Sequence, residues 1–406
     1  MKNDIVIIGC GHAGGMVAIS LRKKGFNGSI LMIGNETHIP YQRPPLSKAF
    51  LYEELNEKRL YLKSKEYYEK NSINILKNRR ANLINTKQKF ILLDNGDQYY
   101  YEKLVIASGS LPKKINIECE DSNIHYLRNI EDALAIKKLL KRKKSLAIIG
   151  AGYIGLEISA SAINMGVKPI VIESQERAMA RSVCKETSDF FTLKHQHEGV
   201  QFIFDASVNR IVDYGNQKKI IYDKNKEIII DSIVIGIGIE PNIELARNSN
   251  LEINDGISVN EYGQTSDKNI FAAGDCTNHP SIFYEGNIRL ESVDNAVEQA
   301  KVVASNLLGI QEPYNSIPWF WSHQYNIKLN IVGISKKHDF KVVEGDMSNE
   351  KFAVYYFLNQ KLVCVEAVNN QKAFSKGKKA ILKRSKISMN LLRKKELNIA
   401  NWLNEL

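Results

Sequence analysis

The sequence contains little cysteine, and no two of its thiols lie close together along the chain. It has five cysteines in 406 residues, and none forms a pair with two or four intervening residues. Zinc sites and iron–sulfur clusters need clustered thiolates, so we expect no resident metal. Distant cysteines can meet in a folded chain, so a redox-active disulfide stays open, although its usual sequence signature is absent. The five are Cys10, Cys119, Cys184, Cys276 and Cys364.

Long apolar runs are absent as well. No stretch approaches the roughly 18 apolar residues that a membrane-spanning helix requires, so the sequence predicts no membrane span. Lys2 and the apolar residues after it resemble the start of a signal peptide, but His12 and four glycines interrupt that stretch. We therefore expect an untargeted, cytoplasmic protein. With 44% hydrophobic and 25% charged residues, the chain has the composition of a globular protein of two or three domains.

Positive charge is concentrated at one end of the chain. The formal net charge is +11, and residues 371–406 hold ten Lys or Arg but only two Glu. Such a basic tail indicates an acidic partner, RNA or an anionic surface. Aromatic residues do not alternate with the charges and no nucleic-acid motif is visible, so we expect no nucleic-acid partner. A solvated helix face in a Lys-rich chain explains the excess equally well.

What the sequence does contain is one glycine pattern, GxGxxG, in two copies 141 residues apart. The first runs from Gly9 to Gly14 after apolar residues 5–8, and the second from Gly150 to Gly155 after residues 146–149. In this strand–turn–helix motif the first glycine makes the turn, the second lets backbone approach a pyrophosphate, and the third lets helix pack on strand. The helix N-terminus then holds the phosphate charge. Two copies predict two dinucleotides and redox chemistry between them; turn glycines without a ligand are the less favoured alternative.

An acidic residue strengthens each copy. A carboxylate at the end of the next strand can accept a hydrogen bond from the adenosine ribose. Glu173 follows the apolar strand 169–172 and lies 18 residues beyond Gly155. Glu36 lies 22 residues beyond Gly14, after the strand 29–33, and is the looser match.

The remaining apolar pattern predicts an α/β fold. A change of texture beyond Pro318, followed by two strand-like runs around Asn359-Gln360, indicates a separate C-terminal α+β module with a hairpin at 351–368. The other expected elements are strands at 103–107, 228–236 and 270–275 and helices at 130–143 and 292–308. The expected fold class is two Rossmann-like dinucleotide-binding domains plus this small C-terminal domain.

Four ordered motifs resemble a known family. They are Tyr41–Lys48 (YQRPPLSK), Ile270–Asp275, Glu291–Ala296 and Pro318–Ser322 (PWFWS). Over essentially the whole chain the sequence resembles the FAD- and NADH-dependent ferredoxin reductases of bacterial oxygenase systems. This is the putidaredoxin reductase and biphenyl dioxygenase reductase group of the pyridine nucleotide-disulfide oxidoreductase superfamily.

The resemblance implies a discontinuous, glutathione-reductase-like domain arrangement. FAD is expected on residues 1–112 and 244–317, NADH on residues 113–243, and a C-terminal domain at 318–406. The implied FAD residues are Gly9, Gly11, Ala13, Gly14, Glu36, Arg43, Lys48, Ala81, Arg128, Asp275 and Val293. The implied NADH residues are Gly150, Gly152, Ile154, Gly155, Glu157 and Glu173.

Three further roles follow from the resemblance. Lys48 and Glu157 are expected close together, near the flavin and the nicotinamide, and Trp321 is expected to shield the flavin. Glu173 is expected to select NADH, because its carboxylate accepts from a 2′-hydroxyl and repels a 2′-phosphate. Arg177, which is nearby in sequence, weakens that expectation.

The chain also departs from the family pattern. Gln42 replaces the commoner Glu, His323 replaces Asp, Cys10 replaces a small apolar residue and Ser108 replaces Thr. Gln42 and His323 each remove a negative charge, which puts partner identity in doubt more than the chemistry.

The implied reaction is hydride transfer from NADH to FAD, followed by single-electron transfer to a [2Fe–2S] ferredoxin or rubredoxin that feeds an oxygenase. The basic tail suggests that this partner is acidic. A dithiol reductase of the same architecture needs a cysteine pair that the sequence does not show. An NADH oxidase, which normally has a reactive cysteine near residues 40–45, and a flavoprotein of the apoptosis-inducing-factor type that acts by binding stay as alternatives.

Overall fold

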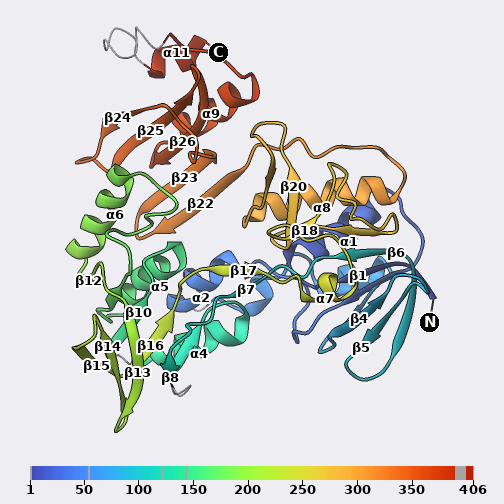
Figure 1. Cartoon of the computed structure of the whole chain (residues 1–406), viewed down its shortest axis with the longest axis horizontal. Helices are drawn as coiled ribbons and strands as arrows, with labels where there is room; N and C mark the ends of the chain where they lie inside the picture. The colour runs from blue at the N-terminus through green and yellow to red at the C-terminus, as the bar shows by residue number, and fades with distance from the viewer. Residues whose placement is uncertain (1, 54, 120–122, 143, 389–398, 406) are drawn as a thin grey trace. The chain divides into compact units, whose positions relative to one another are not determined.

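The structure is a computed structural model that describes residues 2–53, 55–119, 123–142, 144–388 and 399–405. The chain divides into two compact units, each assembled from three separate segments. Figure 1 labels most of their elements. Unit 1 comprises Met1–Arg43, Asn56–Leu111 and Glu240–Pro318, and unit 2 comprises Pro44–Leu55, Pro112–Ile239 and Trp319–Leu406.

The main sheet of unit 1 has a core of parallel, apolar strands, β2 (Ile30–Ile33), β1 (Lys2–Ile8), β6 (Gln98–Ile106) and β19 (Ile270–Ala272). The register pairs Ile8 with Ile106 and Ile106 with Ala272, so the carboxyl ends of three parallel strands meet at one edge. Ligands of α/β sheets bind beyond such an edge. The strands, in sheet order, are β3 (Ile73–Leu76), β2, β1, β6, β5 (Phe90–Leu93) and β4 (Ala81–Asn85), and β19 pairs with β6.

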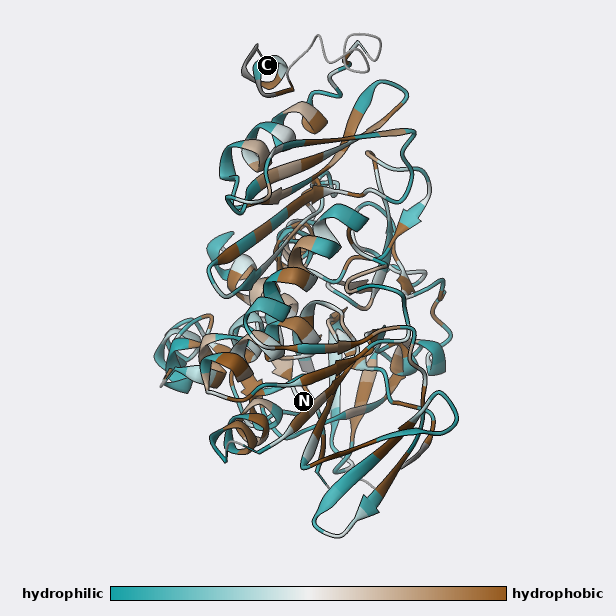
Figure 2. Cartoon of the chain, turned by 90° about the vertical axis from the view of Figure 1, so that its left-hand side faces the viewer, coloured by the Kyte–Doolittle hydropathy of each residue, from teal (hydrophilic) through white to brown (hydrophobic). Residues whose placement is uncertain are grey.

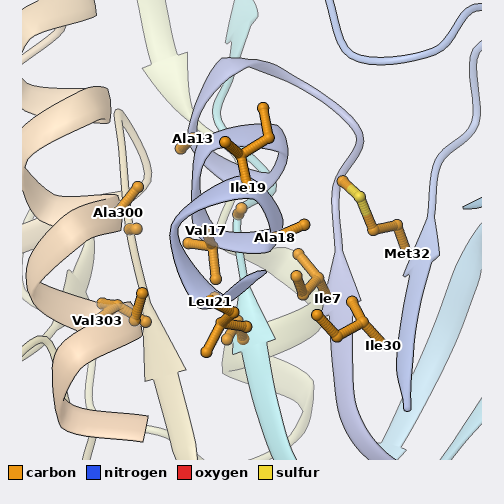
Figure 3. Packing of buried hydrophobic residues seen from close by; sticks show 14 of the residues in the cluster. Ile7, Ala13, Val17, Ala18, Ile19, Leu21, Ile30, Met32, Ala300 and Val303 are labelled. Carbon is orange, nitrogen blue, oxygen red and sulfur yellow. The ribbon is translucent and has the colours of Figure 1, made fainter. Parts of the chain in front are cut away.

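Two helices cover one face of this sheet. Val17 and Leu21 of α1 (His12–Lys23) point toward Ala300 and Val303 of α8 (Val293–Leu307), as Figure 3 shows. These side chains are at most 1% exposed, and burying one Val or Leu stabilises the fold by about 1.5–3 kcal/mol. The packing fixes the start of α1 at the carboxyl edge of β1.

Shorter elements complete unit 1 and the passages between the units. In unit 1 they are η2 (Glu57–Arg59), α3 (Lys65–Lys70), α7 (Glu244–Asn248), β18 (Ile257–Ser258), β20 (Thr277–Pro280) and β21 (Asn287–Ile288). The chain passes from one unit to the other within β7 (Ser110–Pro112) and β17 (Ile239–Pro241).

Unit 2 contains a second parallel sheet. Its strands, in sheet order, are β12 (Gln201–Ile203), β11 (Ile170–Ile172), β10 (Leu146–Ile149), β16 (Ser232–Ile235) and β9 (Ile124–Tyr126). A smaller sheet holds β15 (Lys226–Ile230), β14 (Gln217–Tyr222), β13 (Val208–Tyr214) and β8 (Glu118–Cys119). The helical elements are η1 (Pro44–Ser47), α2 (Ala49–Tyr52), α4 (Ile130–Lys141), α5 (Tyr153–Asn164) and α6 (Lys185–His197).

The C-terminal part of unit 2 is an antiparallel sheet with a helix against it. The helix α9 (Gln371–Leu382) packs on β23 (Ile327–Gly333) and β26 (Lys361–Val368), and α11 (Ile399–Glu405) contacts α9. Figure 2 shows hydrophobic residues gathered on the strands and polar residues in many loops. The strands, in sheet order, are β22 (Trp319–Gln324), β23 (Ile327–Gly333), β26 (Lys361–Val368), β25 (Lys351–Leu358) and β24 (Phe340–Asp346).

The fold class expected from the sequence is confirmed: two Rossmann-like sheets and a C-terminal α+β domain. The hairpin at 351–368 forms as expected, and Asn359 and Gln360 both take positive φ angles, 49° and 66°. The single strand expected at 228–236 is wrong, because the run divides into β15 and β16. The division falls at Asp231, whose carboxylate accepts from the backbone and hydroxyl of Ser145.

Candidate functional site: two glycine turns and a buried ion pair

The first glycine turn, in unit 1, leaves a patch without side chains at its centre. Gly9 has φ 114°, and a Cβ there would lie 2.1 Å from the Ala107 oxygen. A Cβ on Gly14 would lie 2.0 Å from the Gly9 oxygen. A Cβ on Gly11 meets, among the described residues, only the Arg43 guanidinium at 3.8 Å. Packing therefore requires the outer glycines, whereas the middle one opens a space that a ligand can approach.

The second turn, in unit 2, repeats this division. Gly150 has φ 103°, and its Cβ would lie 2.5 Å from the Gly236 oxygen. A Cβ on Gly155 would lie 2.1 Å from the Gly150 oxygen, but one on Gly152 would lie 3.9 Å from Gly236. Again, no contact with the described residues requires a glycine at the middle position.

Both turns lead into helices whose N-termini suit an anion. Within the described ranges, α1 and α5 have no side-chain cap and no acidic residue in the first turn. By contrast, Asn129, Ser292 and Asn370 cap α4, α8 and α9. Unsatisfied N–H groups and the helix dipole attract phosphate, so the residues present fit one pyrophosphate in each unit.

Glu36 follows β2 and lies in a polar cluster of unit 1. The hydroxyl of Tyr41 and the guanidinium of Arg43 both donate to its carboxylate, the latter at 2.6 Å. Arg43 also lies over the Tyr41 ring, 5.0 Å from its centroid. The cluster holds Glu36 beside Arg43, whose guanidinium borders the open space over Gly11.

His12, which sequence reasoning missed, adds a buried polar atom to this edge. Its Nδ1 is buried and has no hydrogen-bond partner among the described residues. Burial, partly opposed by the charge of Asp275, lowers the pKa of His12 to about 4. The imidazole is therefore neutral near pH 7, and its Nδ1 can form a hydrogen bond with a ligand. Asp275 follows β19 and accepts from Ser110 Oγ at 2.9 Å.

Glu173 lies at the end of β11 and braces the second turn. Its Oε2 accepts from the Ala151 backbone at 2.7 Å, and its Oε1 accepts from the Gln175 backbone at 2.9 Å. Arg177 points elsewhere: its guanidinium donates to the carbonyls of Ala180 at 2.9 Å and Val183 at 3.1 Å. The arginine is thus committed to backbone oxygens.

Lys48 and Glu157 form a buried ion pair in unit 2. Lys48 Nζ lies 2.6 Å from Glu157 Oε2, and the glutamate is only 3% exposed. Ser47 Oγ donates to Glu157 Oε2 at 2.5 Å, and Ser322 Oγ donates to Oε1 at 2.6 Å. Charge-assisted hydrogen bonds of this kind satisfy a carboxylate that burial would otherwise penalise. The hydroxyls of Ser47 and Ser322 were not foreseen, because their approach to Glu157 depends on tertiary packing.

The other expected residues take varied positions. Ala13 packs in α1, where a Cβ on Gly274 would come within 2.9 Å of it. Ile154 is 42% exposed at the start of α5, an unusual place for a large apolar side chain. Trp321 stacks on Trp319 with ring centroids 5.2 Å apart. In the remaining positions, Ala81 begins β4, Val293 begins α8, and Arg128 donates its backbone N–H to Asp132.

The four cysteines whose side chains the structure describes are free thiols. Burial raises the pKa of each of them, that of Cys10 to about 12, so none is a reactive thiolate near pH 7. The described part of the chain gathers no group of three or more His, Cys, Asp or Glu that could hold a metal ion. Among the same residues, no helix is both long and apolar enough to cross a membrane.

The fold and its two open glycine turns define a protein of the class that binds two dinucleotides. A family model described as "Pyridine nucleotide-disulphide oxidoreductase" matches residues 3–300, and one described as "Reductase C-terminal" matches residues 319–403. The chain belongs to the pyridine nucleotide-disulphide oxidoreductase family, in the branch that carries this C-terminal domain. It is an FAD-containing oxidoreductase that uses NAD(P)H.

Similar proteins support this membership over almost the full length. Rhodocoxin reductase of Rhodococcus erythropolis is 36% identical over 380 residues, which cover 93% of this chain and 89% of the relative. Rubredoxin-NAD(+) reductase of Pseudomonas putida is 35% identical and covers 90% and 95% respectively. In a crystal structure of a covalent putidaredoxin reductase–putidaredoxin complex, the matching chain gives a TM-score of 0.92 at 34% identity and covers 96% of this chain and 95% of that one.

Proposed function

We propose that this chain is a cytoplasmic NADH-dependent reductase that passes electrons through FAD to an acidic [2Fe–2S] ferredoxin or rubredoxin, which in turn feeds an oxygenase. The observation that carries the proposal is the pair of open glycine turns, each at the head of an uncapped helix in the described structure. When bound, FAD supplies the conversion of a two-electron hydride into single electrons.

In this proposal residues 1–112 and 244–317 bind FAD, residues 113–243 bind NADH, and residues 318–406 form the C-terminal domain. The amides around Gly11 and Gly152 hold the two pyrophosphates, and Glu36 and Glu173 accept from the riboses. Lys48 and Glu157 tune the flavin and nicotinamide environment, and Trp321 shields it. Ala13, Arg43, Ala81, Arg128, Asp275 and Val293 complete the FAD set, and Ile154 completes the NADH set.

NADH rather than NADPH is favoured by the surroundings of Glu173. The carboxylate is anchored to the turn by the Ala151 amide, 2.7 Å away, where it repels a 2′-phosphate. Arg177, the cation that would attract that phosphate, donates to the carbonyls of Ala180 and Val183. The two observations together support an NADH enzyme.

An acidic acceptor is favoured by the charge of the C-terminal region. Lys372, Lys379 and Lys386 are exposed in or just after α9. Partial burial and the like charges of Lys372 and Lys379 lower the pKa of Lys376, as expected where positive charge gathers. The names of the relatives, rhodocoxin reductase and rubredoxin-NAD(+) reductase, support a small electron carrier as the partner.

Steady-state turnover with NADH and NADPH tests the proposal, with an acidic [2Fe–2S] ferredoxin, a rubredoxin and dioxygen as alternative acceptors. The purified protein should be yellow from non-covalent FAD and should reduce a protein acceptor much faster than dioxygen, with NADH preferred. Turnover with dioxygen alone would indicate an NADH oxidase. A long-lived charge-transfer complex with very slow turnover would indicate a flavoprotein that acts by binding.

A further inference from the structure

A continuous chain of buried hydrogen bonds leads from Glu157 to helix α6. The Ser322 hydroxyl donates to Glu157 Oε1 at 2.6 Å, and the Gln324 amide nitrogen donates to that hydroxyl at 3.1 Å. Gln324 Oε1 lies 2.8 Å from His195 Nε2, and the Tyr325 hydroxyl lies 3.0 Å from His195 Nδ1. Ser322, Gln324 and His195 are each at most 1% exposed.

The carboxylate at one end sets the direction of every bond. A carboxylate only accepts, so Ser322 must donate to it and accept from the Gln324 amide nitrogen. The Gln324 oxygen then faces His195, which must donate from Nε2. His195 Nδ1 is left to accept from the Tyr325 hydroxyl. Burial lowers the pKa of His195 to about 4, which agrees with a neutral ring that has one donor and one acceptor.

Tyr325, at the end of the hydrogen-bond chain farthest from Glu157, has an unusual backbone conformation. Tyr325 lies in the two-residue turn between β22 and β23 with φ 55°, a region that bulky residues rarely adopt. Its ring packs edge-on against His195, with centroids 4.9 Å apart, and Lys194 Nζ lies 5.9 Å from the same ring. Contacts with α6 therefore hold the turn in place.

We propose that Ser322, Gln324, His195 and Tyr325 form a positioning relay that fixes the orientation of the Glu157 carboxylate. The proposal rests on the proposed role of Lys48 and Glu157 beside flavin and nicotinamide. A glutamate carboxylate otherwise rotates broadly about its last torsion. With Oε1 held by Ser322, Oε2 stays 2.6 Å from Lys48 Nζ, and the charges are preorganised before the substrate arrives.

The tautomer of His195 tests the relay without any measurement of turnover. In ¹⁵N-histidine-labelled holoenzyme, NMR should show His195 with a proton on Nε2 and none on Nδ1. Tyr325→Phe should shift the Nδ1 resonance, whereas His197→Gln, a change of an exposed residue on the same helix, should leave both His195 resonances in place. A proton on Nδ1 in the wild type would overturn the proposal.

Stopped-flow reduction by NADH tests the consequence for the site. Ser322→Ala should slow hydride transfer about tenfold and Gln324→Met about threefold, with little change in NADH KM, because a hydrogen bond to a charged group is lost or loosened. Tyr355→Phe, which removes a buried hydroxyl from the same sheet outside the relay, should react like the wild type. Equal rates in Ser322→Ala and Tyr355→Phe would refute the relay.

One variant separates this inference from the proposed function. Glu157→Gln keeps the shape but removes the charge, and it should slow hydride transfer more than Ser322→Ala does. An unchanged rate in Glu157→Gln would instead show that the ion pair has no role beside the flavin, whatever tautomer His195 adopts.

Discussion

In the proposed function, the choice between NADH and NADPH depends on Glu173 and Arg177, two side chains that lie four positions apart. Glu173 is fixed to the glycine turn, and Arg177 is bonded to backbone carbonyls of residues 180–184. The sequence alone shows an acidic and a basic residue near the expected nucleotide and cannot say which of them decides the preference. The hydrogen-bond partners favour Glu173 as the deciding residue, because a guanidinium that already donates to carbonyls has fewer donors left for a phosphate.

Glu173→Ala should raise the KM for NADH by about tenfold or more and should narrow the preference over NADPH. The variant loses a charged acceptor for the ribose, an interaction of about 1.5–3 kcal/mol. Steady-state kinetics with both nucleotides measures the effect, and Glu176→Ala, a change of an exposed neighbour, is the matched control. Equal losses with NADH and NADPH would remove Glu173 from the selection of the nucleotide.

A buried neutral histidine makes stability depend on pH. The pKa of His195 is lowered from 6.5 to about 4 by burial, so below pH 6.5 the unfolded chain binds a proton that the folded chain resists. The contribution of the neutral His195 ring to the free energy of unfolding is fully present above pH 6.5. As the pH falls from 6.5 to 4, about 3 kcal/mol of that free energy is lost.

Urea unfolding between pH 7 and pH 4 measures this loss. In His195→Gln the free energy of unfolding should fall less steeply with decreasing pH than in the wild type. The exposed His197→Gln, on the same helix, should keep the wild-type slope. A wild-type slope in His195→Gln would mean that another group titrates.

At the level of elements, the two glycine turns separate packing from binding. The outer glycines of each turn are needed because a Cβ would overlap a backbone oxygen, whereas the middle glycine has room for one. The GxGxxG pattern makes all three glycines look equivalent in the sequence. Their difference appears only in the folded turn, where the first glycine lies against the residue that follows β6 or β16 and the third lies against the oxygen of the first.

Gly152→Ala should therefore fold normally but bind NADH at least tenfold more weakly, because the new methyl group occupies the space that the pyrophosphate approaches. Gly155→Ala should lower the Tm strongly, since its Cβ would lie 2.1 Å from the Gly150 oxygen. Thermal unfolding and NADH titration of both variants distinguish the two effects. NADH binding by Gly152→Ala at wild-type strength would contradict the assigned site.

One hairpin and one divided strand illustrate how much of the secondary structure local sequence predicts. Asn359-Gln360 between two apolar runs predicts the β25–β26 turn, because Asn tolerates a positive φ. The run at 228–236 misleads, because it divides into β15 and β16 at Asp231, whose carboxylate accepts from Ser145, a residue 86 positions away along the chain. Local chemistry thus predicts turns well, but it cannot show where a continuous apolar run breaks.

For the whole molecule, the net charge of +11 concerns the partner rather than the fold. Exposed charge pairs are screened by salt over roughly 10 Å at 0.1 M. If α9 and the residues after it attract an acidic ferredoxin, reduction of that ferredoxin should weaken as ionic strength rises. Part of the basic tail, residues 389–398, lies outside the described residues.

Replacing three exposed basic residues by Gln should flatten this salt dependence and raise the KM for ferredoxin several-fold without changing NADH oxidation by ferricyanide. The three are Lys372, Lys379 and Lys386, and a control set exposed elsewhere in unit 2 is Lys141, Arg142 and Lys224. Stopped-flow reduction of ferredoxin from low to high salt makes the comparison. Identical salt slopes in the two sets would make the tail irrelevant to docking.

The sequence by itself determined the two dinucleotide motifs, the family resemblance and the C-terminal module, because these depend on local spacing: glycines at a turn, acids at a strand end, and paired strands around a two-residue turn. Only the tertiary structure decided which donors surround Glu157. Ser47, Ser322 and Lys48 reach its carboxylate from segments more than 100 residues away along the chain. No local pattern carries that information, since burial of a charge becomes favourable only when partners from different elements meet around it.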